Sequence, residues 1–104
     1  MIDVCDVNEV PVGGGRAFTI AGRRIAVFRV AEGEVYAIDD RCSHDEASLS
    51  EGDVDLEELC VECPMHGSLF DLRTGKPRTL PAFTPVATYR SEIRDGRIFV
   101  EFTA

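Results

Sequence analysis

Two short stretches of the chain each offer one thiol and one imidazole at close spacing. The first is Cys42-Ser43-His44 and the second is Cys63-Pro64-Met65-His66. The chain has only two histidines, and both lie in these stretches. Because thiolates and imidazoles are common metal ligands, the pattern predicts a metal centre. It constrains the fold strongly, since two separate segments must face each other across the metal.

Zinc in a structural binding module is one interpretation of this ligand set. Zinc motifs usually place cysteine beside cysteine and histidine beside histidine. Here the two residue types alternate along the chain, which disfavours zinc without excluding it. A purified protein without colour would support the zinc interpretation, because an iron–sulfur cluster is coloured and zinc is not.

The order C-x-H followed by C-x-x-H resembles the Rieske iron–sulfur motif. The resemblance implies one [2Fe–2S] cluster, with two cysteines on one iron and two histidines on the other. The implied cofactor and metal ligands are Cys42, His44, Cys63 and His66. Two neutral imidazoles in place of two thiolates leave the oxidised cluster uncharged, which raises its reduction potential relative to an all-cysteine cluster.

The chain departs from the Rieske proteins of respiratory complexes at positions that matter for the potential. Those proteins carry one disulfide cysteine in each ligand loop, and the matching positions here are Ala47 and Met65. They also donate hydrogen bonds to cluster sulfur from a serine and a tyrosine. Ser68 matches the serine, but Phe70 stands in place of the tyrosine. Fewer donors stabilise the reduced cluster less, so we expect a potential near the bottom of the Rieske range of about −150 to +300 mV.

The chain of 104 residues has the length of one domain. We expect a single Rieske domain over residues 1–104, with a cluster-binding subdomain at about 40–83. No long segment has a helical period, whereas short β-like runs alternate with turn residues. The expected strands cover residues 17–20, 24–30, 34–38, 59–62, 69–71, 87–93 and 98–102, with a hairpin turn at Asp95-Gly96. The predicted class is all-β, and the resemblance implies an antiparallel β-sandwich or barrel base with a small cluster-binding β-subdomain.

The net charge of −8 disfavours nucleic acid as a partner, because phosphate binding needs lysine and arginine clusters. No apolar run approaches the length of a membrane span, and the acidic start lacks the pattern of a secretory signal. We therefore expect a cytoplasmic protein with no membrane contact. Acidic residues are dense from Asp39 to Glu62. This stretch is either a solvated face or a docking surface for a basic partner.

The chain resembles the ferredoxin component of bacterial aromatic-ring-hydroxylating dioxygenase systems. The resemblance implies an electron carrier of aromatic hydrocarbon catabolism with no catalytic residues. Its partners would be a flavin-containing ferredoxin reductase and a terminal oxygenase, and we expect a monomer. An apolar rim around the cluster would dock the partner and acidic residues would steer it. The rim residues are Pro64, Met65, Pro81 and Phe83, and the nearest acidic residues are Asp45 and Glu46.

Two further interpretations remain open at the level of sequence. The cluster would equally suit the Rieske small subunit of another redox system, such as an assimilatory nitrite reductase. Cys60 and Cys63 also form a C-x-x-C pair, which is typical of thiol redox enzymes when a helix follows. Because Pro64 and Gly67 follow instead, we expect Cys60 to be a small buried apolar residue, whereas the sequence assigns no role to Cys5.

Overall fold

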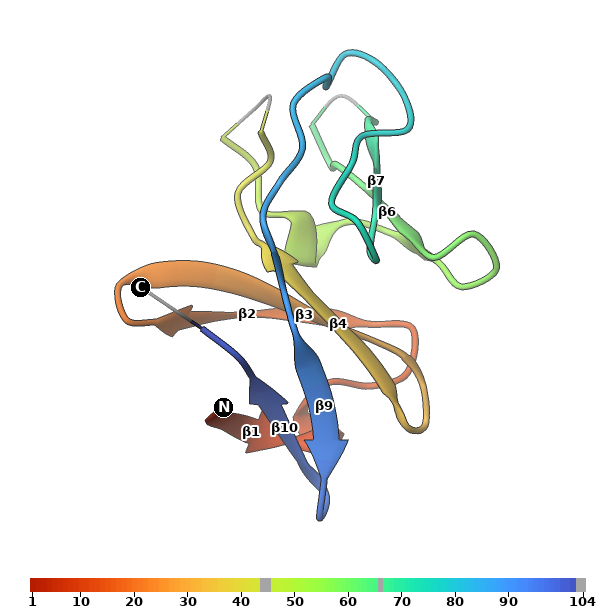
Figure 1. The fold of residues 1–104 in the computed structure, drawn as a ribbon. Coiled ribbons are helices and arrows are strands. Elements are labelled where there is room, and N and C mark those ends of the chain that lie inside the picture. The colour runs from red at the N-terminus through yellow and green to blue at the C-terminus, as the bar shows by residue number, and fades with distance from the viewer. Residues whose placement is uncertain (44–45, 66, 103–104) are drawn as a thin grey trace.

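The computed structural model describes residues 1–43, 46–65 and 67–102. Within these residues the chain forms ten strands in three sheets, and every strand pair is antiparallel. Two sheets form the base of the molecule, and the third lies above them together with three long loops (Figure 1). The predicted all-β class, with a base and a small added sheet, is therefore confirmed.

The larger sheet of the base has the order β2-β3-β4-β8. Its strands are β2 (Gly15–Ile20), β3 (Arg23–Ala31), β4 (Glu34–Asp39) and β8 (Thr88–Tyr89). Six consecutive residues of β3 are buried, as its near-continuous apolar run predicts. Ala26 and Phe28 pack into the core beneath the upper loops, whereas Ile25 and Val27 pack into the core of the base. Because side chains alternate along a strand, β3 supplies both cores.

The second sheet of the base has the order β1-β10-β9. Its strands are β1 (Ile2–Asp6), β10 (Arg97–Val100) and β9 (Ser91–Arg94). Asp95 and Gly96 connect β9 to β10 with φ angles of 51° and 75°. Both angles lie in the left-handed region that a two-residue hairpin turn requires, so the predicted hairpin is confirmed.

The prediction of one strand over residues 87–93 is wrong. Thr88 and Tyr89 pair with β4 of the larger sheet, whereas β9 begins at Ser91 and pairs with β10 of the other sheet. The chain changes sheets at Arg90, whose carbonyl oxygen accepts a hydrogen bond of 2.8 Å from Glu101 N. The alternating pattern of this segment fits a strand in either sheet, so it does not reveal the change.

The small sheet has the order β5-β6-β7 and carries the second cysteine stretch between β6 and β7. Its strands are β5 (Val54–Asp55), β6 (Cys60–Glu62) and β7 (Leu69–Asp71). Gly52 precedes it and lies so close to β6 that a Cβ atom there would be 1.9 Å from the Glu62 carbonyl oxygen. A glycine is therefore needed where the chain enters this sheet.

The helices among the described residues are two short 3₁₀ turns, η1 (Val7–Glu9) and η2 (Leu49–Glu51). Asp6 and Glu9 cap the first of these turns reciprocally. None of the helices in the described part of the chain has the length and apolar character needed to cross a membrane.

Candidate iron–sulfur site

The two cysteine stretches form loops of the same length, each closed by the same type of hydrogen bond. Cys42 follows β4, and its backbone N donates to the carbonyl oxygen of Ala47 at 3.0 Å. Cys63 follows β6, and its backbone N donates to the carbonyl oxygen of Ser68 at 2.8 Å. Each bond spans six residues from the cysteine onward. We call residues 42–47 and 63–68 the first and second ligand loops.

Both cysteines are buried in one apolar cluster, with 2% of Cys42 and 1% of Cys63 exposed. The same cluster contains Val61, Phe70 and Ala82. Soft thiolate ligands in apolar surroundings suit an iron–sulfur cluster. A buried thiolate without a cation is costly, and bound iron would offset that cost. The two cysteines therefore fit the predicted group.

His44, His66 and Asp45 lie outside the described residues. Among the residues that are described, no group of three or more metal-binding side chains occurs. Neither predicted histidine ligand belongs to these residues. The structure therefore places the two cysteines of the predicted ligand set and leaves the ligand assignment as a prediction.

A third loop, which we call the covering loop (residues 79–85), is hydrogen-bonded to both ligand loops. Ser43 Oγ donates to the carbonyl oxygen of Thr84, and Ala82 N donates to Ser68 Oγ at 3.0 Å. The three loops lie at the same end of the molecule (Figure 1). The covering loop, which contains Pro81 and Pro85, therefore contacts both ligand loops directly.

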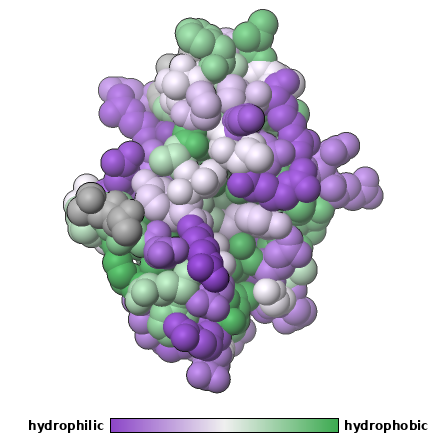
Figure 2. All heavy atoms as spheres, viewed as in Figure 1, coloured by the Kyte–Doolittle hydropathy of each residue, from purple (hydrophilic) through white to green (hydrophobic). Residues whose placement is uncertain are grey.

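Large apolar side chains are exposed at this end of the molecule. Leu80 is 78% exposed, Phe83 79% and Met65 61%. Pro64 is also exposed and Pro81 is half-buried. Figure 2 shows the apolar surface at the end formed by the covering loop. The predicted apolar rim is thus exposed, and Leu80 joins it.

Asp40 lies just before the first ligand loop and is only 1% exposed. Its carboxylate accepts hydrogen bonds from Ser50 N at 2.9 Å and from Arg24 Nε at 2.8 Å, and its carbonyl oxygen accepts one from Leu49 N. Burial raises the pKa of Asp40, but the hydrogen bonds from Ser50 and Arg24 outweigh it and hold that pKa below its ordinary value. Nearby, Glu46 pairs with Arg41 at 3.1 Å, and both side chains are exposed.

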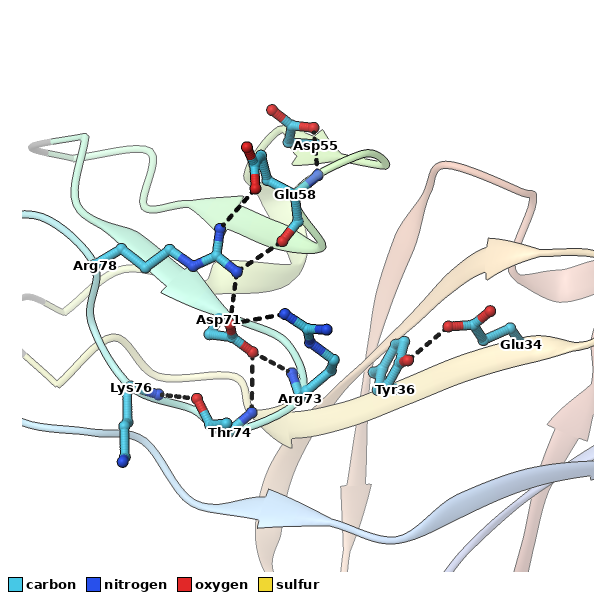
Figure 3. Close-up of polar contacts among 9 residues, drawn as sticks. All are labelled: Glu34, Tyr36, Asp55, Glu58, Asp71, Arg73, Thr74, Lys76 and Arg78. Carbon is cyan, nitrogen blue, oxygen red and sulfur yellow. Dashed lines mark hydrogen bonds and ion pairs between the residues drawn. The ribbon is translucent and has the colours of Figure 1, made fainter.

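Asp71 organises the approach to the covering loop (Figure 3). Its carboxylate accepts hydrogen bonds from Arg73 N at 2.8 Å, Thr74 N at 3.1 Å and Arg78 Nη2 at 2.6 Å. Arg78 Nη2 also donates to the carbonyl oxygen of Glu58 at 2.8 Å. Burial raises the pKa of Asp71, but these donors, led by Arg78, lower it to about 2.

Several residues of the site have no counterpart in the sequence prediction. They are Ser43, Asp40, and the Asp71–Arg78 pair. The acid–x–x–x–Gly turn from Asp71 to Gly75 is a signal for the last of these, since aspartate side chains often cap such turns. The other contacts join segments far apart in sequence, which no local pattern indicates.

The thiol redox interpretation finds no support in this geometry. Cys60 lies within β6 rather than at the start of a helix and is 2% exposed. Burial raises the pKa of its thiol, which opposes formation of a reactive thiolate. Cys5, Cys60 and Cys63 form no disulfide within the described chain. Cys60 is therefore a buried core residue, as expected, and Cys5 is buried as well.

Comparison with known proteins identifies the family. The Rieske [2Fe–2S] domain matches residues 1–90. The chain is 46% identical over 97 residues to the 3-phenylpropionate/cinnamic acid dioxygenase ferredoxin subunit of Photorhabdus laumondii, covering 93% of this chain and 90% of that protein.

Solved structures give the same result. The ferredoxin of carbazole 1,9a-dioxygenase from Nocardioides aromaticivorans IC177 superposes with a TM-score of 0.90 at 37% identity, covering 95% of this chain and 94% of that one. A ferredoxin in complex with the oxygenase of carbazole 1,9a-dioxygenase gives 0.85 at 34% identity, covering 96% and 100%. A chain described as an NADH-dependent nitrite reductase small subunit from Mycobacterium tuberculosis gives 0.86 at 25% identity, covering 99% and 95%.

These relatives are electron-carrying components and not the catalytic subunits of their systems. The twin ligand loops, the two buried cysteines and the covering loop agree with that role. The chain therefore belongs to the Rieske [2Fe–2S] family and is a ferredoxin, an electron carrier with one Rieske-type cluster as its cofactor.

Proposed function

We propose that the chain is the low-potential ferredoxin of an aromatic-ring dioxygenase system, carrying one electron at a time from a flavin-containing reductase to a terminal oxygenase. The observation that carries the proposal is the pair of matching ligand loops with buried cysteines, in a chain 46% identical to a dioxygenase ferredoxin. The identity to the nitrite reductase subunit is 25%, so the dioxygenase role is favoured.

The proposed ligands are Cys42 and Cys63 for one iron and His44 and His66 for the other. Burial of both cysteines in one apolar cluster supports the first pair. When bound, a Rieske cluster supplies a centre that holds one additional electron. The buried cysteines and the covering loop would shield that centre from water at the end of the molecule formed by the three loops.

A low potential is supported by the side chains around the cysteines. Phe70 is fully buried and apolar where respiratory Rieske proteins have a hydroxyl donor. Ala47 and Met65 offer no disulfide between the ligand loops. Fewer hydrogen bonds to the reduced cluster make reduction less favourable. We therefore expect a potential near −150 mV, at the low end of about −150 to +300 mV.

The docking surface for both partners is the apolar rim of Met65, Leu80 and Phe83, together with Pro64 and Pro81. Residues 40–83 contain ten acidic and four basic residues, a net charge of −6 out of −8 for the chain. This charge would steer a basic partner toward the rim. The acidic residues include Asp45 and the exposed Glu46.

We further propose that the chain is one Rieske domain with a cluster-binding subdomain at about 40–83, and that it works as a cytoplasmic monomer. The small sheet lies within that range of residues. Buried thiols at Cys5 and Cys60 without a disulfide are typical of a reducing compartment. An exposed rim suits a carrier that must meet two partners in turn.

An EPR-monitored redox titration of the purified protein tests whether the chain holds a Rieske cluster of low reduction potential. One Rieske-type signal that appears at about −100 to −200 mV supports the proposal. A potential above about +100 mV would contradict the low-potential role, and one zinc per chain without an EPR signal would contradict the cluster itself.

Electron transfer from a reductase through this protein to a terminal oxygenase tests the proposed partners. The reductase and oxygenase of the Photorhabdus laumondii 3-phenylpropionate/cinnamic acid system serve as probes, with their own ferredoxin as positive control. We expect Phe83→Ala to lower kcat/KM about 5–30-fold, since a central apolar anchor contributes about 1–2 kcal/mol. Val12→Ala is the matched control, because Val12 is 45% exposed but lies outside the three loops. Equal activity of Phe83→Ala and wild type would refute docking through the rim.

A further inference from the structure

The covering loop exposes large apolar side chains while its backbone is held firmly. Phe83 is 79% exposed, so packing against the core does not fix its position. Its two neighbours in the chain are held instead. The N of Ala82 donates to Ser68 Oγ at 3.0 Å, and the carbonyl oxygen of Thr84 accepts a hydrogen bond from Ser43 Oγ.

The two serines come from different ligand loops. Ser43 directly follows Cys42 in the first loop. Ser68 closes the second loop, where its carbonyl oxygen accepts the hydrogen bond from Cys63 N. The covering loop is thus fastened to one ligand loop on each side of Phe83. Any shift of a ligand loop would be transmitted to the backbone that carries this side chain.

The remaining contacts of the covering loop lie at its ends. Leu69 N donates to Thr79 Oγ1 at 2.8 Å where the loop begins, and Val86 N donates to the carbonyl oxygen of Gly75 at 2.9 Å where it ends. These contacts fix where the loop enters and leaves. Among the described residues, the side-chain hydrogen bonds that reach the two residues flanking Phe83 are those of Ser43 and Ser68.

We propose that Ser43 and Ser68 form a clamp that holds Phe83 in position for docking of the partner. They are positioning residues, and the inference rests on the proposed function of the rim. A loop that is ordered before docking loses less conformational entropy when the complex forms. Removing the Ser43 side of the clamp should therefore weaken binding of the partner while the transfer step at saturation stays the same.

The first test is hydrogen exchange of the purified holoprotein, read by mass spectrometry. We expect Ser43→Ala to speed exchange of amides in residues 79–86 at least threefold, with no change in β3. Ser43→Thr keeps a hydroxyl and should restore the wild-type rate. Ser91→Ala is the matched control, because Ser91 Oγ also donates to a backbone carbonyl, that of Val35 at 3.2 Å, but in the base. Unchanged exchange in Ser43→Ala would overturn the clamp even where electron transfer to the oxygenase is normal.

The second test asks whether the clamp acts through Phe83. Electron transfer to the Photorhabdus laumondii oxygenase is measured for Ser43→Ala, Phe83→Ala and the double variant. We expect Ser43→Ala to raise KM about 3–10-fold, with an unchanged limiting rate, EPR spectrum and reduction potential. In the Phe83→Ala background the same change should have no further effect, because no anchor remains to be positioned.

The outcomes separate this inference from the proposed function. An equal rise in KM in both backgrounds would overturn the clamp, as would a shifted potential with unchanged KM. Failure of the wild-type protein to transfer electrons, while the relative's own ferredoxin does, would overturn the partner assignment. The hydrogen-exchange test would still decide the clamp. Ser68→Ala serves as a second variant for the hydrogen-exchange test. Loss of the Ser68 hydroxyl removes the acceptor of Ala82 N on the other side of Phe83.

Discussion

The substitution Asp71→Asn tests the polar network that leads into the covering loop. The asparagine oxygen can still accept hydrogen bonds from the backbone N of Arg73 and Thr74, which now lie at 2.8 and 3.1 Å. The other carboxylate oxygen, 2.6 Å from Arg78 Nη2, would become an amide nitrogen. That nitrogen cannot accept a hydrogen bond from a guanidinium. The variant therefore loses the ion pair and keeps the turn.

The magnitude follows from the pKa of Asp71, which falls from an ordinary value of 3.8 to about 2. Since one pKa unit corresponds to about 1.4 kcal/mol, the charged form contributes about 2 kcal/mol to the free energy of unfolding. The side chain is 12% exposed, so screening by solvent reduces this value little. A depressed pKa stabilises the fold above about pH 4, and this contribution is lost as the pH falls toward 2.

Because unfolding releases the cluster, the assay is the rate at which urea bleaches the visible absorption of the holoprotein. At pH 7 we expect Asp71→Asn to bleach up to about 30-fold faster, the equivalent of about 2 kcal/mol lost from the native state alone. Arg73→Ala is the control, because the Arg73 side chain is 55% exposed and its Nη2 lies 3.6 Å from the Asp71 carboxylate. This variant should change the rate less than about twofold. Equal rates for Asp71→Asn and Arg73→Ala would refute the argument. So would a ratio of Asp71→Asn to wild type that stays constant between pH 4 and 2.

Two further predictions concern the turn after β7 and the ionisation of tyrosine. Gly75→Ala should destabilise the protein by about 2–4 kcal/mol in thermal melting, because the φ of Gly75 is +76° and a Cβ atom would lie 2.1 Å from the Val86 carbonyl oxygen. The control is Gly33→Ala, where a Cβ atom would meet open space, and it should change the stability by less than about 0.5 kcal/mol. Equal losses of stability in the two variants would contradict the steric reason. Burial and the hydrogen bond to an aspartate raise the pKa of Tyr89 to about 12, and a hydrogen bond to a glutamate raises that of Tyr36. Because these are the only two tyrosines, an ultraviolet titration should show less phenolate at pH 10 than two ordinary tyrosines would give. Ordinary ionisation of both rings would contradict the two hydrogen bonds.

Local patterns in the sequence were sufficient for the elements whose structure depends on neighbouring residues. Asp95-Gly96 specifies a tight hairpin because both residues tolerate a positive φ. The apolar run of β3 predicts a strand covered on both faces, and six consecutive residues are buried there. The two cysteine stretches predict loops that face one another, and Cys42 and Cys63 share one apolar cluster.

Features that depend on distant contacts could not be predicted in this way. Arg29 lies within the apolar run of β3 and is 7% exposed. Its guanidinium donates to the carbonyl oxygens of Val7 and Val10, in a segment near the N-terminus that packs against β3. The change of sheets at Arg90 and the bond from Ser43 to the covering loop are of the same kind. Each depends on which distant backbone group lies nearby, and the composition of one segment does not specify that.

The two-faced burial of β3 has a consequence for how the molecule comes apart. Phe28 belongs to the core beneath the ligand loops, while Val27, the preceding residue, belongs to the core of the base. A strand that anchors two cores cannot leave one of them without disturbing the other. The upper part and the base are therefore one cooperative folding unit, and partial opening that exposes the cysteines while the base stays intact is disfavoured. The cofactor is protected by the stability of the whole chain and not only by the loops around it.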